Sequence, residues 1–256
     1  VCTMLLLAGH SPWIAMLCAV LAGLLAGTVT GLLHVLLGIP PILAGILTQM
    51  VLWSVNLKIL GKANQALPAR SIDVLLTQMN IPAALPVLLG WAAVLVTLLV
   101  LFFSTELGCA LRATGCNPVM SRAQGVNTGL MKVIGLALSN AVVAMSGGLL
   151  CQYQGYTDVN MGRGAVVIGL AAVVIGQAVL GRRGGHMAAQ LGGVVLGAVI
   201  YYIVYQVIIF AGFDTDLLKM FSAVVVAVFL GVPHVRDQIR TNSRIKKGGS
   251  RHAENA

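Results

Sequence analysis

Long apolar runs separated by short polar segments dominate the sequence. Seven runs are predicted to cross a bilayer as helices, which rise ~1.5 Å per residue through a hydrocarbon core ~30 Å thick. They cover residues 13–37, 42–60, 83–103, 133–150, 164–180, 188–210 and 217–232. Residues 1–8 are too short to span, so we expect the tail of a truncated helix and an N-terminally incomplete chain. The pattern predicts an all-α, polytopic helical membrane bundle over residues 1–232, followed by a polar tail, residues 233–256.

The first full run carries a small residue at every fourth position. These residues are Ala19, Gly23, Gly27 and Gly31. On a helix they share one face, and small residues let a second membrane helix approach closely. Glycine is common in membrane helices, but four small residues in register favour a packing face. We therefore expect this helix to be buried in the bundle.

Composition agrees with a membrane protein and argues against other classes. The chain is 58% hydrophobic and 9% charged, with a mean hydropathy of +0.94, whereas soluble domains carry about 25% charged residues. A net charge of +9 suggests nucleic acid only when basic residues share one soluble face, and here they lie in loops and the tail. Five cysteines form no CxxC pair, and neither a Walker A motif nor a catalytic triad spacing is present. The sequence predicts no enzyme, cofactor, metal site or nucleic-acid partner.

The distribution of basic residues predicts the orientation in the membrane. If the C-terminal tail is cytoplasmic, eleven of the 16 basic residues lie inside and five outside, and four of the seven acids lie outside. Cytoplasmic loops are enriched in Lys and Arg, which favours this arrangement. It places the tail and the 106–127 segment in the cytoplasm of a cell that carries the chain in its plasma or inner membrane.

The 106–127 segment, between the third and fourth runs, is the candidate functional region. Irregular backbone is not tolerated in lipid, so this glycine-containing, basic stretch must lie at a membrane face. Gly115 and Asn117-Pro118 predict a tight turn between two short helices. Asn117 can cap the helix that Pro118 begins, and Gly115 is expected to need a backbone conformation or close approach that a side chain would block. By composition alone, an ordinary basic loop fits equally well.

The predicted membrane interior holds polar but uncharged residues. Ion-coupled carriers usually keep an ionisable residue at mid-depth, and the central thirds of these runs have none. Gln49, Asn140 and Gln177 are candidates for lining a translocation path, although hydrogen bonding between helices would explain each of them. Such a chain is a passive channel, an assembly factor, or a subunit driven by a partner at the 106–127 segment.

The sequence Leu-Arg-Ala-Thr-Gly-Cys-Asn at residues 111–117, followed by Ala-Gln-Gly-Val-Asn at 123–127, resembles a known coupling segment. It is similar to that of ABC importer permeases of the branched-chain amino acid and ribose type, and more narrowly of the tryptophan-type branch. Residues 38–41, 175–181 and 212–218 agree with the same pattern. The basic turn at 181–186 departs from it, because many relatives are neutral there.

This resemblance implies a homodimer of permeases in the bilayer, two ATPase subunits docked beneath, and an extracytoplasmic solute-binding protein. The transported solute would be a small organic molecule such as an amino acid. The alternative is a partner-free channel or structural membrane protein. By the resemblance, eight residues belong to the segment that meets the ATPase: Glu106, Arg112, Ala113, Gly115, Asn117, Arg122, Gly125 and Asn127.

The charge distribution generates a topology prediction. In a cysteine-free background, a cysteine at Asp158 should react with a membrane-impermeant thiol reagent added to intact cells, and one at Gly184 should not. Permeabilised cells serve as the control, because both positions should then react. External labelling of Gly184→Cys in intact cells would reverse the orientation.

Overall fold

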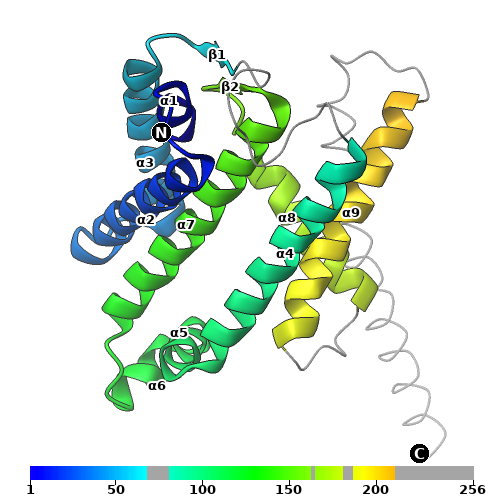
Figure 1. The fold of residues 1–256 in the computed structure, drawn as a ribbon. Helices are drawn as coiled ribbons and strands as arrows, with labels where there is room; N and C mark the ends of the chain where they lie inside the picture. The colour runs from blue at the N-terminus through cyan, green and yellow to red at the C-terminus, as the bar shows by residue number, and fades with distance from the viewer. Residues whose placement is uncertain (68–80, 163–164, 181–186, 211–256) are drawn as a thin grey trace, which may run out of the picture. The chain divides into compact units, whose positions relative to one another are not determined.

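The computed structural model describes residues 1–67, 81–162, 165–180 and 187–210, and it divides into two compact units, Val1–Met161 and Gly162–Ala256 (Figure 1). In the first unit the elements are α1 (Cys2–Leu7), α2 (Pro12–Leu36), α3 (Pro41–Leu60), β1 (Asn64–Ala66), α4 (Ile81–Ser104), α5 (Glu106–Cys116), α6 (Pro118–Ala123), α7 (Thr128–Gln154) and β2 (Tyr156–Asp158). The second unit contains α8 (Ala165–Leu180) and α9 (Met187–Phe210).

The predicted polytopic helical membrane fold is confirmed. Within the described ranges, five helices are long and apolar enough to cross a bilayer: α2, α3, α4, α7 and α9. Helix α8 is also apolar but has only 16 residues. The predicted last span at 217–232, the basic turn at 181–186 and the tail at 233–256 lie outside the described residues.

The polar segments that follow the predicted spans 42–60 and 133–150 contain regular structure. Helix α7 continues through Gln154 and ends where Gly155 takes the left-handed conformation (φ 72°), which glycine adopts at little steric cost. The chain then forms β2, which pairs antiparallel with β1, with Gln65 opposite Thr157. Three-residue strands carry too little periodicity to be recognised in a sequence, because their pairing is a tertiary contact.

Helices α2 and α7 pack antiparallel, backbone against backbone (Figure 1). A Cβ placed on Gly31 would lie 2.8 Å from Val133 Cα, and one on Gly27 would lie 2.7 Å from Ala137 Cα. On Gly23 it would lie 2.6 Å from the Asn140 carbonyl oxygen. Each distance is shorter than real Cβ contacts, so only glycine fits along this face of α2. The structure thus places α7 against the row of small residues.

A hydroxyl pair joins α2 to α3. Thr30 Oγ1 donates to Thr48 Oγ1 over 2.9 Å, and both side chains are buried. Each hydroxyl also lies within hydrogen-bonding distance of a carbonyl oxygen one turn earlier on its own helix, Ala26 for Thr30 and Ala44 for Thr48. Both polar groups are therefore satisfied without water, as a membrane interior requires.

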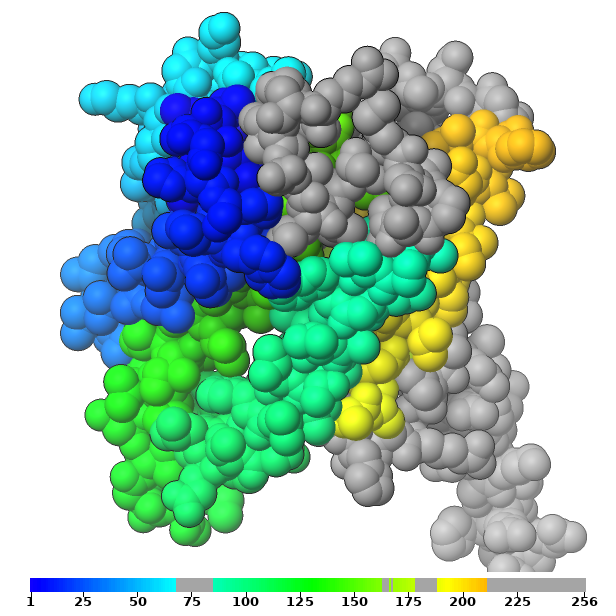
Figure 2. All heavy atoms as spheres, in the orientation of Figure 1, coloured from blue at the N-terminus to red at the C-terminus, as the bar shows by residue number. Residues whose placement is uncertain are grey.

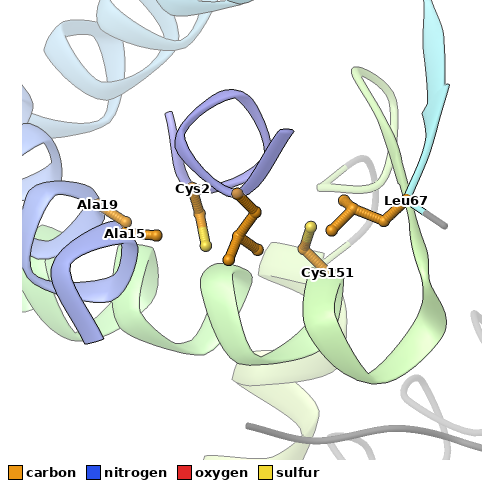
Figure 3. Close-up of a cluster of buried hydrophobic side chains, with 6 residues drawn as sticks. Cys2, Ala15, Ala19, Leu67 and Cys151 are labelled. Carbon is orange, nitrogen blue, oxygen red and sulfur yellow. The ribbon is translucent and has the colours of Figure 1, made fainter. Parts of the chain in front are cut away.

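The short helix α1 closes one end of the first unit. Cys2 and Leu6 are buried in a cluster with Ala15, Ala19, Leu67 and Cys151, most of which Figure 3 labels. Leu67 directly follows β1, and its amide donates to the Gly155 carbonyl over 2.8 Å. Thr3 Oγ1 lies 2.6 Å from Thr157 Oγ1 in β2. The strand pair is thereby tied to the end of α7 that lies opposite α5 and α6 (Figure 1).

In the described part of the second unit, α8 and α9 form a close pair of helices. A Cβ on Gly197 of α9 would lie 2.6 Å from the Gly176 amide nitrogen of α8, so these backbones also meet through glycine. Ala171, Ile175 and Tyr201 form the buried cluster between them. Small residues again let membrane helices approach closely.

The α2–α7 contact predicts a large penalty for a side chain in it. Gly27→Leu should destabilise the detergent-solubilised protein by about 3 kcal/mol or more, since overpacking costs roughly 1–3 kcal/mol even where side chains can adjust. Gly147→Leu on α7 is the matched control, because Gly147 is exposed with nothing within 4 Å of an added Cβ. Thermal melting in one detergent measures both. Equal melting of Gly27→Leu and the parent would show that α7 does not pack here.

Candidate functional site

Helix α5 begins with a capped turn directly after α4. Thr105 Oγ1 accepts a hydrogen bond from the Gly108 amide over 3.3 Å, which satisfies one of the free donors at a helix N-terminus. Glu106 lies in the first turn, where a carboxylate interacts favourably with the helix dipole. Further along, Leu111 packs against Gly135 of α7, at 3.0 Å from a Cβ placed there. Helix α5 is thus anchored to both α4 and α7.

The turn between α5 and α6 has the predicted cap. Asn117 Oδ1 accepts from the amides of Val119 (3.1 Å) and Met120 (3.0 Å), and Pro118 occupies the first helical position. The backbone N–H of Asn117 donates to the Ala113 carbonyl of α5 over 2.9 Å. One residue therefore ends the first short helix and starts the second.

The role expected of Gly115 within its own chain is wrong. Gly115 lies in the last turn of α5 without a positive φ, and an added Cβ would have nothing within 4 Å. Gly108 is the position that tolerates only glycine. A Cβ there would lie 2.5 Å from Phe103 Cα and overlap the Phe102 carbonyl oxygen. The sequence could not separate the two, because the constraint on Gly108 comes from the angle between α4 and α5.

A second junction connects α6 to α7. Gly125 takes φ 84°, and the Val126 amide closes the turn onto the Ser121 carbonyl over 3.0 Å. Asn127 then caps α7, with its Oδ1 accepting from the Leu130 amide over 3.1 Å. The need for glycine at 125 follows from its left-handed conformation.

A side chain crosses the same junction. Arg122 Nε donates to Thr128 Oγ1 over 2.8 Å, and Thr128 is only 1% exposed. This bond ties the last turn of α6 to the first turn of α7. The resemblance assigned Arg122 to the segment that meets the ATPase, and this internal bond was not foreseen.

All eight residues assigned to the segment by resemblance are exposed: Glu106, Arg112, Ala113, Gly115, Asn117, Arg122, Gly125 and Asn127. Sequence reasoning missed two more residues, Val119 and Met120, whose side chains are 76% and 61% exposed. Apolar residues directly after Asn117-Pro118 in a segment outside the bilayer were the available signal. In Figure 2 this segment forms the lower edge of the first unit. The exposed apolar tip of α6 suits contact with another protein.

The three residues proposed for a translocation path belong to three different helices. Gln49 is exposed on α3, and Gln177 is exposed on α8 in the second unit. Asn140 is half-buried on α7 opposite Gly27, and its Nδ2 donates to the Leu136 carbonyl of its own helix over 2.9 Å. Asn140 therefore has a packing role in the α2–α7 contact, and lining a path remains a prediction for all three.

The fold defines a polytopic membrane protein with two short exposed helices, α5 and α6, between two spans. Over residues 1–233 the chain matches the family described as "Branched-chain amino acid transport system / permease component", and it belongs to that family. It is a permease subunit of an ABC importer.

Individual relatives agree with this family. The chain is 35% identical, over 93% of its length and 79% of the relative's, to a "Tyrosine transport system permease protein" of Clostridioides difficile. It is 32% identical, over 74% of its length and 55% of the relative's, to the "Autoinducer 2 import system permease protein LsrC" of Escherichia coli. An uncharacterized protein of Rickettsia prowazekii is 27% identical over 84% of this chain and 77% of its own. No solved structure matches.

The two α5 glycines generate a paired prediction. Gly108→Ala should lower the melting temperature of the solubilised protein, because the methyl group would overlap the α4 backbone. Gly115→Ala should keep or raise it, since alanine favours a helix over glycine by about 0.5–1 kcal/mol. Circular dichroism melts of both variants in one detergent provide the comparison. A Gly108→Ala protein at least as stable as Gly115→Ala would contradict the α4–α5 geometry.

Proposed function

We propose that the 106–127 segment is the cytoplasmic docking element through which a separate ATPase subunit drives this permease. In this proposal two copies of the chain form the translocation path, and an extracytoplasmic binding protein delivers the solute to it. ATP hydrolysis belongs to the partner. Family membership supports the general scheme, and the geometry of the segment supports the particular residues.

The observation that carries the proposal is a folded, exposed structure between two spans. Helices α4 and α7, on either side of the segment, are both long and apolar enough to cross a bilayer. Between them, α5 and α6 are capped at each start by a side chain, Thr105 and Asn117 respectively. An ordinary loop has no need of two capped helices. A surface that another protein binds gains from being pre-formed, because less conformational freedom is lost on association.

The chemistry of the surface indicates how the partner would bind. The tip of α6 offers Val119 and Met120, which would fill an apolar groove. Arg112 and Arg122 are exposed beside it and can face acidic groups at the rim of that groove. Such rim pairs steer association more than they add affinity. Burial of the two apolar side chains is therefore the main source of affinity in this proposal.

The orientation follows from charge. Arg112, Arg122 and Lys132 lie at the end of α7 where α5 and α6 pack, and Asp158 lies at the other end, in β2. The excess of basic residues belongs on the cytoplasmic side. We therefore propose that the docking segment and the C-terminal tail face the cytoplasm, and that the β1–β2 pair faces outside, where a binding protein would approach.

The solute is proposed to be a small organic molecule, with an amino acid as the first choice. A relative that covers 93% of this chain is described as a tyrosine transport permease, and another relative as an autoinducer 2 import permease. Two relatives that are each about one third identical to this chain are thus described with different solutes. This agrees with a binding protein that selects the solute. An aromatic amino acid is the first solute to test.

The docking surface can be tested at one position. Met120→Asp should fold, because the side chain is 61% exposed and the segment lies outside the spans, yet lose both ATPase association and solute uptake. Met120→Leu should retain both, since it keeps an apolar side chain of similar volume. Co-purification and uptake of a labelled amino acid are measured in membranes with matched permease levels.

A second variant tests the neighbouring turn. Gly115→Asp leaves the chain's own packing unchanged, because nothing lies within 4 Å of an added Cβ, so any loss of association arises from the partner. If both Met120→Asp and Gly115→Asp keep full association and uptake, the segment is only a loop and the partner-free channel interpretation replaces the proposal.

A further inference from the structure

The first two turns of α7 are held from two sides by polar side chains. On one side they meet α6 of the docking segment, and on the other they meet the end of α2 and the turn that leads into α3. All of these contacts lie within the first unit.

On the docking side, Arg122 Nε donates to the Thr128 hydroxyl over 2.8 Å. Thr128 is the first residue of α7 and is almost fully buried. Arg122 is exposed, so this hydrogen bond connects a cationic side chain at the surface to the buried hydroxyl of Thr128. A hydrogen bond from a charged donor is roughly twice as strong as a neutral one.

On the other side, Lys132 Nζ lies 3.4 Å from His34 Nε2, and His34 Nδ1 lies 2.7 Å from the Ile39 carbonyl oxygen. An ammonium group only donates and a carbonyl only accepts, so both contacts are satisfied by one imidazole tautomer, with the proton on Nδ1 and the lone pair on Nε2. His34 is near the end of α2, and Ile39 lies in the turn between α2 and α3.

The backbone between these contacts is tightly packed. Gly129 of α7 would place a Cβ 3.1 Å from Val35 Cγ1 of α2, and one turn further Val133 lies against Gly31. The first turn of α7 cannot shift towards α2 without displacing that helix, because close-packed interiors transmit strain rather than absorb it.

We propose that Arg122–Thr128 and Lys132–His34–Ile39 form one relay, which transmits movement of the docking segment through the first two turns of α7 to the α2–α3 turn. These five are positioning residues, and their contacts couple ATPase closure to rearrangement of the spans. The inference rests on the proposed function, since it assumes that a partner moves α6. It assigns the internal bond of Arg122 a role separate from docking.

The test measures solute taken up per ATP hydrolysed by the assembled transporter in proteoliposomes. Thr128→Val removes the acceptor hydroxyl and should lower this ratio about tenfold, the equilibrium effect of one charge-assisted hydrogen bond, while ATPase association stays at the parent level. Thr97→Val is the matched control, because Thr97 is exposed on α4 and bonds only its own helix, to Ala93 O over 2.8 Å. It should keep the parent ratio.

The second half of the relay has its own variants. Lys132→Met removes the donor to His34 and should lower uptake per ATP with association retained, whereas Lys132→Arg restores a donor and should recover most of the loss. If the Thr128→Val protein fails to assemble, the comparison of Lys132→Met with Lys132→Arg tests the relay by itself. A parent ratio in Lys132→Met, or an equal loss in Thr97→Val, would overturn the relay. If the parent chain never associates with an ATPase, the proposed function fails and the relay fails with it.

Discussion

The close approach of α2 and α7 is the contact on which the rest of the first unit depends. Along three turns of α2, glycine removes the side chain that would separate the two backbones. The axis of α7 is thereby fixed, and structures at both ends of the unit are attached to that axis. The 106–127 segment bonds the first turn of α7 through Arg122 and packs against Gly135 of the same helix through Leu111, and the β1–β2 pair follows the last turn.

A membrane explains why the contact has this form. Lipid tails are as apolar as leucine side chains, so burying such side chains between helices provides little driving force. Association must come from close van der Waals contact and a few satisfied hydrogen bonds. The structure uses both: glycines between α2 and α7, and the Thr30–Thr48 hydroxyl pair between α2 and α3. The large apolar residues that remain exposed, such as Ile42 and Leu25, suit contact with lipid.

The sequence predicted what depends on local composition. Apolar runs gave the described spans to within a few residues, and Asn117-Pro118 gave the capped turn, because hydropathy and capping act over one or two turns. It failed where distant segments meet. Gly108 is constrained by the α4–α5 angle, the strands exist only as a pair, and the Lys132–His34 contact joins residues 98 positions apart. For the 106–127 segment, resemblance supplied eight residues that the structure shows to be exposed, and only the structure showed the apolar tip of α6.

The caps explain how so short a segment can be ordered before it meets the proposed partner. A six-residue helix in water is unstable by itself, because nucleation is costly and few hydrogen bonds follow it. Asn117 occupies two of the free N-terminal donors of α6, and the chain closes its far end through Ser121 and Arg122. Val119 and Met120 are therefore held in a defined arrangement before any partner binds, so the energy of docking is not spent on folding the segment. A force applied to this tip would act on a segment that packs against both α4 and α7, and it would be passed to these two helices.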